Sequence, residues 1–337
     1  MPRCLISLGA NLGDPRRTLE VALQRIEQCP RIVRVSTSRF HRTRPIGGPA
    51  GQREYLNAVA LCETSLPPQD LLEFLLNLEI DLGRERRTRW DARTIDLDLL
   101  LYDDLVTRKD ALVLPHPRMA FRRFVLSPAV EIAADWVHPT TGWTIRRLVQ
   151  HLDEASNYVA IAGAAGTGKT FLAQQTASAV VGKFLADPIA GYRPSVRDDQ
   201  ASLDPNMEIE FLRQRAQLLS RHTMAARQTG AYCISDFWLD QSLACARRET
   251  TPDGVFGRLE QLRDELRPNV IGPKLLILLE PAPHASPRNG LGCQGQEFCS
   301  ELVKQARDSA VGPWLILSAK DRGRAKAEIK AAIEAME

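Results

Sequence analysis

Two patterns of hydrophobic and polar residues alternate along the first hundred residues. Apolar residues alternate with polar ones, or form short runs, in four segments that we predict to be strands: 3–9, 32–42, 54–64 and 94–102. They recur at helical spacing in two segments that we predict to be helices, 15–28 and 68–83. The order β-α-β-β-α-β is that of an α+β ferredoxin-like sandwich, with its helices packed on one face of an antiparallel sheet.

The segments between these elements differ in character. A Gly/Pro loop is expected over 43–53 and an Arg-rich loop over 84–93. The less regular segment 104–150 is expected to cover one edge of the sheet and to end in a short helix near 144–152.

A second pattern begins near residue 155. A short apolar run at 158–162 predicts a buried strand, and the Gly-rich turn 163–170 leads into a helix that ends near residue 181. Further predicted strands at 232–235, 275–279 and 314–317 alternate with predicted helices at 206–229, 253–267, 294–310 and 321–336. This alternation favours an α/β fold with a parallel sheet covered on both faces. We therefore expect two domains, residues 1–154 and residues 155–337.

The composition indicates a globular protein of the cytoplasm. A formal net charge of +3 is small for 337 residues and gives no electrostatic reason to expect nucleic acid or an anionic membrane as a partner. The seven cysteines form no C-x-x-C pair, which favours reduced thiols. The sequence contains no run of 18 apolar residues, so we expect no membrane span. The first residues lack the apolar region of a signal peptide.

The predicted strand 94–102 carries two carboxylates at alternate positions. Its apolar side chains are expected to share the core face: Ile95, Leu97, Leu99 and Leu101. Asp96 and Asp98 then share the opposite face, about 6.5–7 Å apart along the strand. Two such carboxylates repel each other, and a pair of Mg²⁺ ions that bridge a triphosphate would compensate the repulsion. Alone, this pattern also fits an exposed polar face, but flanking arginines favour a polyphosphate: Arg84, Arg86, Arg87, Arg89, Arg93, Arg118, Arg122 and Arg123.

Six ordered groups of residues give the segment 1–150 a resemblance to a known family. They are Ser7–Gly13, Thr43–Gly47, Tyr55–Ala58, Glu79–Arg84, Arg89–Asp98, and Leu114–Met119 with Arg122–Phe124. In this order and spacing they resemble the 6-hydroxymethyl-7,8-dihydropterin pyrophosphokinase family. The resemblance implies ATP-dependent transfer of diphosphate to the hydroxymethyl group of a reduced pterin in folate biosynthesis, with AMP as the second product.

The same resemblance implies a role for individual residues. Asp96 and Asp98 would hold two Mg²⁺ ions and form the catalytic set together with Arg84 and Arg93. The pterin would lie against one group: Thr43, Pro45, Ile46, Tyr55, Asn57, Trp90 and Phe124. ATP would lie against a second group: Glu79, Arg84, Arg93, His116 and Arg122. The Arg-rich loop 84–93 would act as a lid over the bound substrates.

Several of these residues also have purely structural explanations. Tyr55 and Phe124 fit core aromatics, and His116 between two prolines fits a turn residue. An RNA-recognition module shares the same element order, but it needs exposed aromatic residues on its central strands. The strand 56–61 has none, and the acidic pair would repel RNA.

The turn at 163–170 carries a nucleotide-binding pattern. Its residues fit G-x-x-x-x-G-K-[ST] between a strand and a helix, the context that a P-loop requires: Gly163, Ala164, Ala165, Gly166, Thr167, Gly168, Lys169 and Thr170. Backbone N–H groups of such a loop cradle phosphates, Lys169 would reach the β and γ oxygens, and Thr170 would ligate Mg²⁺.

Residues 157–337 resemble, more weakly, the deoxynucleoside kinase family. Asp187-Pro188 stands where that family has a Glu-Pro whose carboxylate is the general base. Gln214, followed by Leu219-Ser220-Arg221, matches its Gln…Leu-Ser-Arg helix, in which Gln214 would pair with the nucleobase. Ser235-Asp236-Phe237 stands where the family has Asp/Glu-Arg-Ser/Thr. The implied nucleoside site consists of Asp187, Gln214, Arg221 and Asp236.

The chain departs from this second family at residues that stabilise phosphoryl transfer. Phe237 replaces the expected arginine, the lid segment 281–292 has Arg288 as its one arginine, and Asp187 is one methylene shorter than glutamate. The sequence leaves three alternatives for this domain: a fully active deoxynucleoside kinase, a weak one, or a non-catalytic module that binds nucleotide or forms a homodimer.

Overall fold

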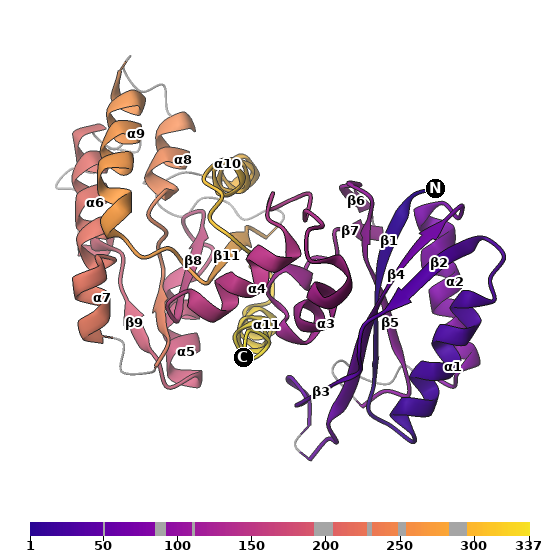
Figure 1. Cartoon of the computed structure of the whole chain (residues 1–337). Coiled ribbons are helices and arrows are strands. Elements are labelled where there is room, and N and C mark those ends of the chain that lie inside the picture. Colours follow the sequence, from indigo (N-terminus) through magenta and orange to yellow (C-terminus); the bar gives the residue numbers. More distant parts are fainter. Residues whose placement is uncertain are drawn as a thin grey trace. The chain divides into compact units, whose positions relative to one another are not determined.

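The computed structural model describes residues 1–49, 51–84, 92–109, 112–191, 205–227, 231–248, 254–282 and 295–337. They form two compact units, Met1–Asp153 together with Ala331–Glu337, and Glu154–Lys330. Figure 1 shows the elements of each unit. Among the described residues, no helix is both long and apolar enough to cross a membrane.

An antiparallel sheet forms the centre of the first unit. Its strands are β1 (Arg3–Ala10), β2 (Ile32–Thr37), β3 (His41–Thr43), β4 (Tyr55–Thr64) and β5 (Asp96–Tyr102). The order is β2-β4-β1-β5, and β3 also pairs with β4. The expected α+β class is confirmed, but the single strand predicted over 32–42 is two strands, β2 and β3.

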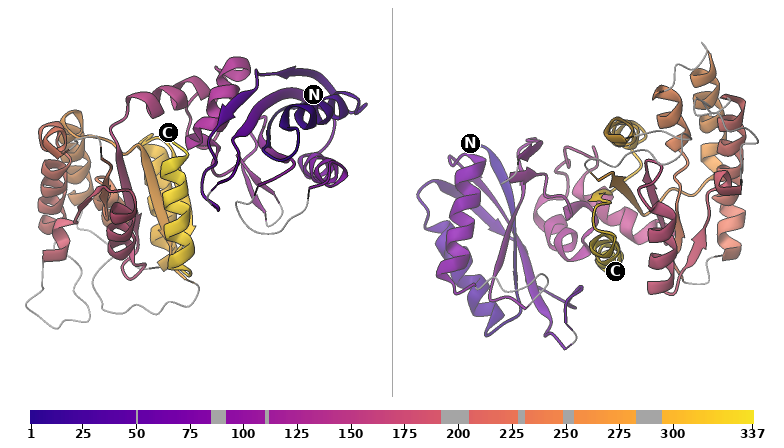
Figure 2. Two further views of the ribbon diagram at one scale, coloured as in Figure 1. Left: turned by 90° about the horizontal axis from the view of Figure 1, so that it is seen from below. Right: turned by 180° about the vertical axis from the view of Figure 1, so that it is seen from behind.

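Helices α1 (Pro15–Glu27) and α2 (Pro68–Asp81) pack on one face of this sheet (Figure 2). α1 begins at Pro15, where a missing N–H costs nothing, and the Asp14 carboxylate accepts a hydrogen bond of 3.1 Å from the backbone N of Arg17. Buried residues of both helices form one core with the sheet: Leu19, Ala22, Ile26, Leu71, Leu75 and Leu78 with Cys4, Ile6, Leu8, Ala60, Cys62 and Leu97.

The opposite face of the sheet is covered by α3 (Arg123–Ala133), which packs against β3 and β4 (Figure 1). The sequence pattern did not predict this helix, because Pro128 lies inside it and proline usually ends a helix. The expectation that helices cover one face alone is therefore wrong. The hairpin β6 (Thr107–Lys109) and β7 (Leu112–Leu114) lies beside β5, and α4 (Ile145–Glu154) is the expected short helix.

A β-bulge between β1 and β5 changes which residues of β5 face the core. Ile6 pairs with Leu99 and Leu5 pairs with Leu101, so Leu100 is the additional residue. Leu99 lies in the core under α1 and α2. Leu101 shares the opposite face with Leu5, and the prediction that Leu101 lies on the same face as Leu99 is wrong.

A parallel sheet forms the centre of the second unit. Its strands are β8 (Tyr158–Gly163), β9 (Lys183–Leu185), β10 (Cys233–Ser235), β11 (Leu275–Glu280) and β12 (Trp314–Ser318), in the order β12-β11-β8-β10-β9. Each neighbouring pair is parallel. The predicted parallel sheet is confirmed, and β8, its central strand, is buried along its whole length.

Helices cover both faces of this second sheet. α5 (Lys169–Ala179) and α11 (Arg322–Glu334) lie side by side, joined by a hydrogen bond of 3.0 Å from Lys326 Nζ to Gln175 Oε1 (Figure 2). Four helices share one core with the sheet's other face: α6 (Pro205–Leu218), α8 (Gln241–Arg248), α9 (Val255–Leu266) and α10 (Gly295–Asp308). α7 (Arg221–Arg227) follows α6, so the helix predicted over 206–229 is two helices. α8 was not predicted.

Candidate functional site

Polar side chains from three neighbouring strands lie together on the face of the first sheet that α3 covers. Asn57 of β4 pairs with Gly9 of β1, and Gly9 pairs with Asp96 of β5. Directly paired residues of antiparallel strands carry their side chains on the same face, so Asn57 and Asp96 flank Gly9. Two residues away, Ser7 pairs with Asp98. Asn57, predicted to bind the pterin, thus lies on the same face as Asp96 and Asp98, the predicted metal ligands.

Gly9 lets the side chain of Asn57 lie close to the backbone of β1. A Cβ atom at Gly9 would lie 2.9 Å from Asn57 Oδ1, closer than real contacts of this kind. The sequence analysis did not single out Gly9. The available signal was a glycine inside a predicted strand, which often marks the close approach of another group.

Asp96 is paired with two arginines from different segments. Arg84, just after α2, lies with Nη2 2.8 Å from Asp96 Oδ1, and Arg93, just before β5, lies with Nη1 2.7 Å from Asp96 Oδ2. Each arginine therefore takes one oxygen of the carboxylate. These arginines border the segment 85–91, which includes Trp90 and most of the predicted lid and lies outside the described residues.

A second carboxylate, Glu79, supports Arg84. Glu79 is 1% exposed and forms an ion pair with Arg84. Its Oε1 also accepts a hydrogen bond of 2.7 Å from the backbone N of Leu97. Burial raises the pKa of Glu79 to about 6, while the hydrogen bond from Leu97 and the charge of Arg84 act in the opposite direction. Glu79 thus joins α2 to β5 and orients Arg84 toward Asp96.

Asp98 faces two further basic residues at longer range. His116 Nε2 lies 3.8 Å and Arg122 Nη1 lies 4.0 Å from Asp98 Oδ2. Burial lowers the pKa of His116, and the charge of Arg122 lowers it further, so this imidazole is neutral at pH 7. Burial also lowers the pKa of Arg122 to about 10, which leaves the guanidinium charged. Both residues, which the resemblance assigns to the ATP site, thus lie next to Asp98.

Two of the residues predicted to bind the pterin, Thr43 and Tyr55, lie beside Asn57 on the paired strands β3 and β4. Thr43 of β3 pairs with Tyr55, and Asn57 Nδ2 donates a hydrogen bond of 2.7 Å to Thr43 Oγ1. Phe124 lies in the first turn of α3, with Arg122 Cζ 5.3 Å from the centroid of its ring. Because α3 packs on β3 and β4, these residues border one region of the sheet. The chain that follows β3 carries Pro45 and Ile46.

The donor atoms of Asp96 and Asp98 fit magnesium brought by a nucleotide. Within the described ranges, no group of three or more His, Cys, Asp or Glu side chains is arranged to hold a metal ion. Mg²⁺ is commonly held by one or two carboxylates and takes its other ligands from substrate phosphates and water. Two carboxylates on one face of a strand suit that mode of binding.

Comparisons with known proteins address this first unit. The family described as 7,8-dihydro-6-hydroxymethylpterin-pyrophosphokinase (HPPK) matches residues 5–134. The 2-amino-4-hydroxy-6-hydroxymethyldihydropteridine pyrophosphokinase of Haemophilus influenzae is 43% identical over 136 residues, which make up 40% of this chain and 84% of that protein. The protein of the same name from Methylorubrum extorquens is 40% identical over 153 residues, 45% of this chain and 95% of that protein. The chain belongs to the HPPK family.

The HPPK match covers less than half of this chain. The protein of Lactococcus lactis subsp. lactis named "Bifunctional protein FolKE" is 36% identical over 132 residues, which make up 39% of this chain and 38% of that protein. The resemblance stated for residues 1–150 is confirmed over residues 5–134. The comparisons do not confirm the deoxynucleoside kinase resemblance of residues 157–337.

The second unit holds the Gly-rich turn between β8 and α5. Gly166 and Gly168 have φ angles of +80° and +82°, in the left-handed region that favours glycine. At Gly163, a Cβ atom would lie 2.9 Å from the carbonyl oxygen of Leu279. The turn thus depends on glycine at three positions, and α5 begins directly after it at Lys169.

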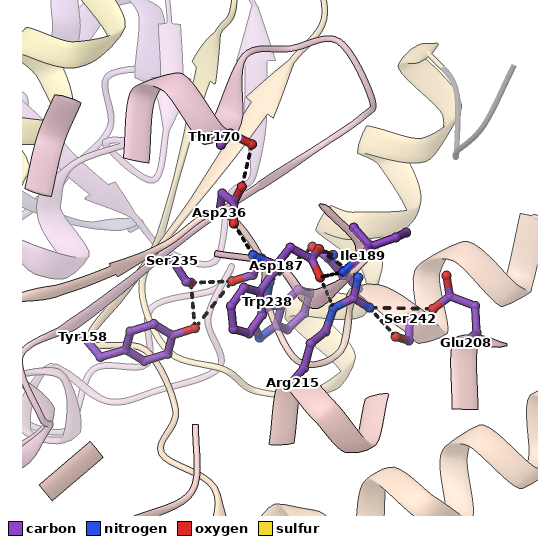
Figure 3. Close-up of polar contacts among 12 residues, drawn as sticks. Tyr158, Thr170, Asp187, Ile189, Glu208, Arg215, Ser235, Asp236, Trp238 and Ser242 are labelled. Carbon is purple, nitrogen blue, oxygen red and sulfur yellow. Dashed lines mark hydrogen bonds and ion pairs between the residues drawn. The ribbon is translucent and has the colours of Figure 1, made fainter. Parts of the chain in front are cut away.

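A chain of polar contacts leads from this turn to the end of β9 (Figure 3). Thr170 Oγ1 donates a hydrogen bond of 2.5 Å to Asp236 Oδ2, and Asp236 Oδ1 accepts one of 2.7 Å from the backbone N of Asp187. Asp236 follows β10 and Asp187 follows β9. These strands are neighbours in a parallel sheet, so their carboxyl ends meet at the edge where such folds bind ligands.

Asp187 forms a buried ion pair with Arg215, a residue that the sequence analysis missed (Figure 3). Arg215 Nε lies 3.0 Å from Oδ1 and Nη2 lies 2.9 Å from Oδ2. Two further donors reach the same carboxylate, the backbone N of Ile189 at 3.3 Å and Gln241 Nε2 at 2.9 Å. A carboxylate has about four lone-pair sites, so these contacts saturate Asp187.

The other two residues of the predicted nucleoside site lie away from these carboxylates. Gln214 Nε2 donates a hydrogen bond of 3.0 Å to Glu210 Oε1 on the exposed side of α6. Arg221 Nε donates one of 3.2 Å to the carbonyl oxygen of Pro268. Consecutive residues point about 100° apart around a helix, so the inward position belongs to Arg215 rather than Gln214.

Phe237, which replaces the expected arginine, is fully buried. Its side chain lies in the core of the second unit, and its carbonyl oxygen accepts a hydrogen bond of 2.5 Å from Ser235 Oγ. The position therefore contributes no positive charge. Residues 283–292 of the expected lid, Arg288 among them, lie outside the described residues.

Proposed function

We propose that the first unit transfers the diphosphate of ATP to the hydroxymethyl oxygen of 6-hydroxymethyl-7,8-dihydropterin in folate biosynthesis and releases AMP. Membership of the HPPK family supports this reaction. The observation that carries it is the position of Asn57 and Asp96 on either side of Gly9. An amide suited to the pterin edge and a carboxylate suited to metal-bound phosphate thereby lie on the same face of the sheet, on the two strands that flank β1.

Asp96 and Asp98 would hold two Mg²⁺ ions in this reaction. Bound there, magnesium would supply positive charge next to the transferring phosphoryl group. Arg84 and Arg93 neutralise Asp96 and lie where their guanidinium groups can form charge-assisted hydrogen bonds with phosphate oxygens. Three further residues complete the proposed ATP site: Glu79, His116 and Arg122.

The pterin would lie between Tyr55 and Phe124, since a planar heteroaromatic ring stacks well between aromatic side chains. Asn57 Nδ2 donates to Thr43, and Asn57 Oδ1 lies against Gly9, on the face of the sheet that carries Asp96. This oxygen is therefore available to accept a hydrogen bond from an N–H group of the pterin. Three further residues complete the proposed pterin site: Pro45, Ile46 and Trp90.

The reaction is tested by measuring where the γ-phosphate of labelled ATP is found after the reaction. The full chain is incubated with Mg²⁺, the pterin and ATP labelled in its γ-phosphate. We expect the label in the pterin product and one AMP for each pterin diphosphate. Formation of ADP, or the absence of labelled pterin, would contradict the proposal.

For the second unit we propose nucleotide binding without phosphoryl transfer. The glycine conformations of the turn support a P-loop in which Lys169 reaches the β and γ oxygens. Thr170 and Asp236, whose oxygens face each other, would hold Mg²⁺. Asp187 has no lone pair left to accept a proton, because Arg215 and two further donors occupy its oxygens. This saturation argues against Asp187 as a general base.

The alternative is a bifunctional enzyme whose second unit is an active deoxynucleoside kinase. Calorimetry with ATP distinguishes the two sites. The double variant D96A/D98A removes the carboxylates of the first site, so the ATP binding that remains is assigned to the second unit. Adding K169A to this variant should abolish that binding. Steady-state assays with all four deoxynucleosides then test transfer. Turnover of about 1 s⁻¹ or faster that is lost in K169A would show an active kinase.

A further inference from the structure

Asn11 lies between the two segments that lead into the proposed site. It follows β1 directly, and its side chain is 1% exposed. β1 is antiparallel to both β4 and β5, so its end lies beside the start of each of these strands. The chain that enters β4 and the chain that enters β5 therefore meet at Asn11.

Asn11 is hydrogen-bonded to both of these segments. Its Oδ1 accepts a hydrogen bond of 2.8 Å from the backbone N of Arg93. The backbone N atoms of Asn11 and Leu12 donate to the carbonyl oxygen of Arg93, at 3.1 and 3.2 Å. Asn11 Nδ2 donates to the carbonyl oxygen of Arg53 at 3.2 Å and to Gln52 Oε1 at 3.4 Å. One buried amide thus joins Arg53 to Arg93.

These contacts link the two halves of the proposed site. The Arg93 backbone is held at both its N–H and its C=O, and its guanidinium reaches Asp96. Arg53 lies two residues before Tyr55, which opens β4. We propose that Asn11 is a positioning residue that fixes Arg93 relative to Tyr55 and so aligns ATP with the pterin. This inference rests on the proposed pyrophosphokinase function.

A positioning role predicts a specific kinetic defect. Each substrate alone contacts mainly its own half of the site, whereas in-line transfer needs both halves in register. A misplacement of about 1 Å can cost about 10²-fold in rate. In N11A we expect kcat to fall about 10- to 100-fold, while the Kd of each substrate alone changes less than about 3-fold.

The variant N11D changes the hydrogen bond to Arg53 while it keeps the one from Arg93. Its carboxylate can still accept from the Arg93 N–H, but when ionised it repels the carbonyl oxygen of Arg53. When protonated it regains a donor for that oxygen. Burial at this position, where Asn11 is 1% exposed, raises the pKa of a carboxyl group above its usual value of about 3.9. The ratio of N11D to wild-type kcat should therefore rise as the pH is lowered from about 8 to about 5.5.

Thr64 provides a matched control at the far end of β4. It is fully buried, and its Oγ1 donates a hydrogen bond of 2.9 Å to the Arg31 carbonyl and accepts one of 3.0 Å from the Leu66 N. T64V removes buried hydrogen bonds of the same kind without touching the site. We expect it to lower the thermal midpoint, as N11A does, and to leave kcat unchanged.

Three results would overturn the inference: wild-type kcat in N11A, a loss of kcat in T64V as large as that in N11A, or an N11D to wild-type ratio that does not change with pH. If N11A does not fold, the pH dependence of the N11D to wild-type kcat ratio still tests the role of Asn11. Wild-type activity separates the two claims. Its absence overturns the proposed function, whereas equal activity in wild type and N11A overturns only the role of Asn11.

Discussion

His138, which follows α3 in the first unit, is held in its neutral form by the fold. It is 5% exposed, and its Nδ1 accepts a hydrogen bond of 3.2 Å from the backbone N of Thr141. Burial lowers its pKa from 6.5 to about 4. Protonation would turn the acceptor into a donor that faces an N–H group. The folded state therefore binds this proton less readily than the unfolded chain, and the first unit loses stability as the pH falls through this interval.

We predict that His138 makes the free energy of unfolding of the first unit fall by up to about 3 kcal/mol as the pH drops from 6.5 to about 4. H138N keeps an acceptor oxygen for Thr141 and does not titrate, so its dependence on pH should be flatter. Urea unfolding at several pH values measures this, with H222N, which replaces an exposed histidine of the second unit, as the control. Identical slopes for wild type and H138N would contradict the prediction.

The sequence predicted some single residues of the site better than others. Alternation along a strand was enough to place Asp96 and Asp98 on one face, because side-chain direction repeats every second residue. The register between strands does not follow from alternation. The position of Gly9 between Asn57 and Asp96 therefore required the structure.

Helix α6 is attached to the second unit by charged side chains as well as by its apolar face. The buried Arg215 pairs with Asp187, donates a hydrogen bond of 2.6 Å to Ser242 Oγ and lies 3.6 Å from Glu208 Oε2. Burial raises the pKa of Glu208, and its Oε2 has no hydrogen-bond partner in the described part of the chain. One cation thus compensates two buried carboxylates, and its removal would leave both without the charge partner that the described residues provide.

We predict that R215M destabilises the second unit by about 3–5 kcal/mol, because a buried charge without its partner is costly. R213M changes an exposed arginine of the same helix and should stay within about 0.5 kcal/mol of wild type. Thermal unfolding and the exchange rates of α6 amide protons measure both effects. A stable R215M with unchanged exchange in α6 would show that the apolar face alone holds the helix.

Elements with a clear pattern in their own sequence were predicted, whereas elements that depend on packing against the rest of the unit were missed. α1 and α2 were predicted because a clear apolar spacing and favourable first residues agree. α3 was missed because Pro128 interrupts an otherwise apolar helix, and the surrounding packing tolerates it. On α6, the family pattern directed attention to Gln214, while the buried contact belongs to its neighbour Arg215. Buried arginines are rare, so composition gave no signal for it.

At the scale of the whole molecule, the chain joins an HPPK unit to a unit with a parallel sheet. The family match ends at residue 134, and the first compact unit extends to Asp153. Ala331–Glu337, at the end of the chain, also belongs to this first unit. The expected domain 1–154 therefore leaves out Ala331–Glu337. These residues are far from the rest of the unit in the sequence, so the sequence pattern does not show that they belong to it.

We predict that a chain ending at residue 154 folds and makes the pterin diphosphate, because every residue assigned to the pterin and ATP lies before that point. It should unfold more readily than the first unit of the full chain, since it lacks Ala331–Glu337. Circular dichroism, thermal unfolding and the pterin assay measure these properties. An insoluble or inactive fragment, with an active full chain, would show that residues 1–154 are not an independent domain.

We propose that the pyrophosphoryl transfer depends on the carboxylates of Asp96 and Asp98. The most direct measurement compares kcat/KM of the full-length D96A and D98A variants with that of D104A, which removes an exposed carboxylate shortly after β5. Loss of a metal ligand should cost several kcal/mol, so D96A and D98A should each fall at least about 10²-fold while D104A keeps wild-type activity. Full activity in D96A or D98A, or an equal loss in D104A, would contradict the account.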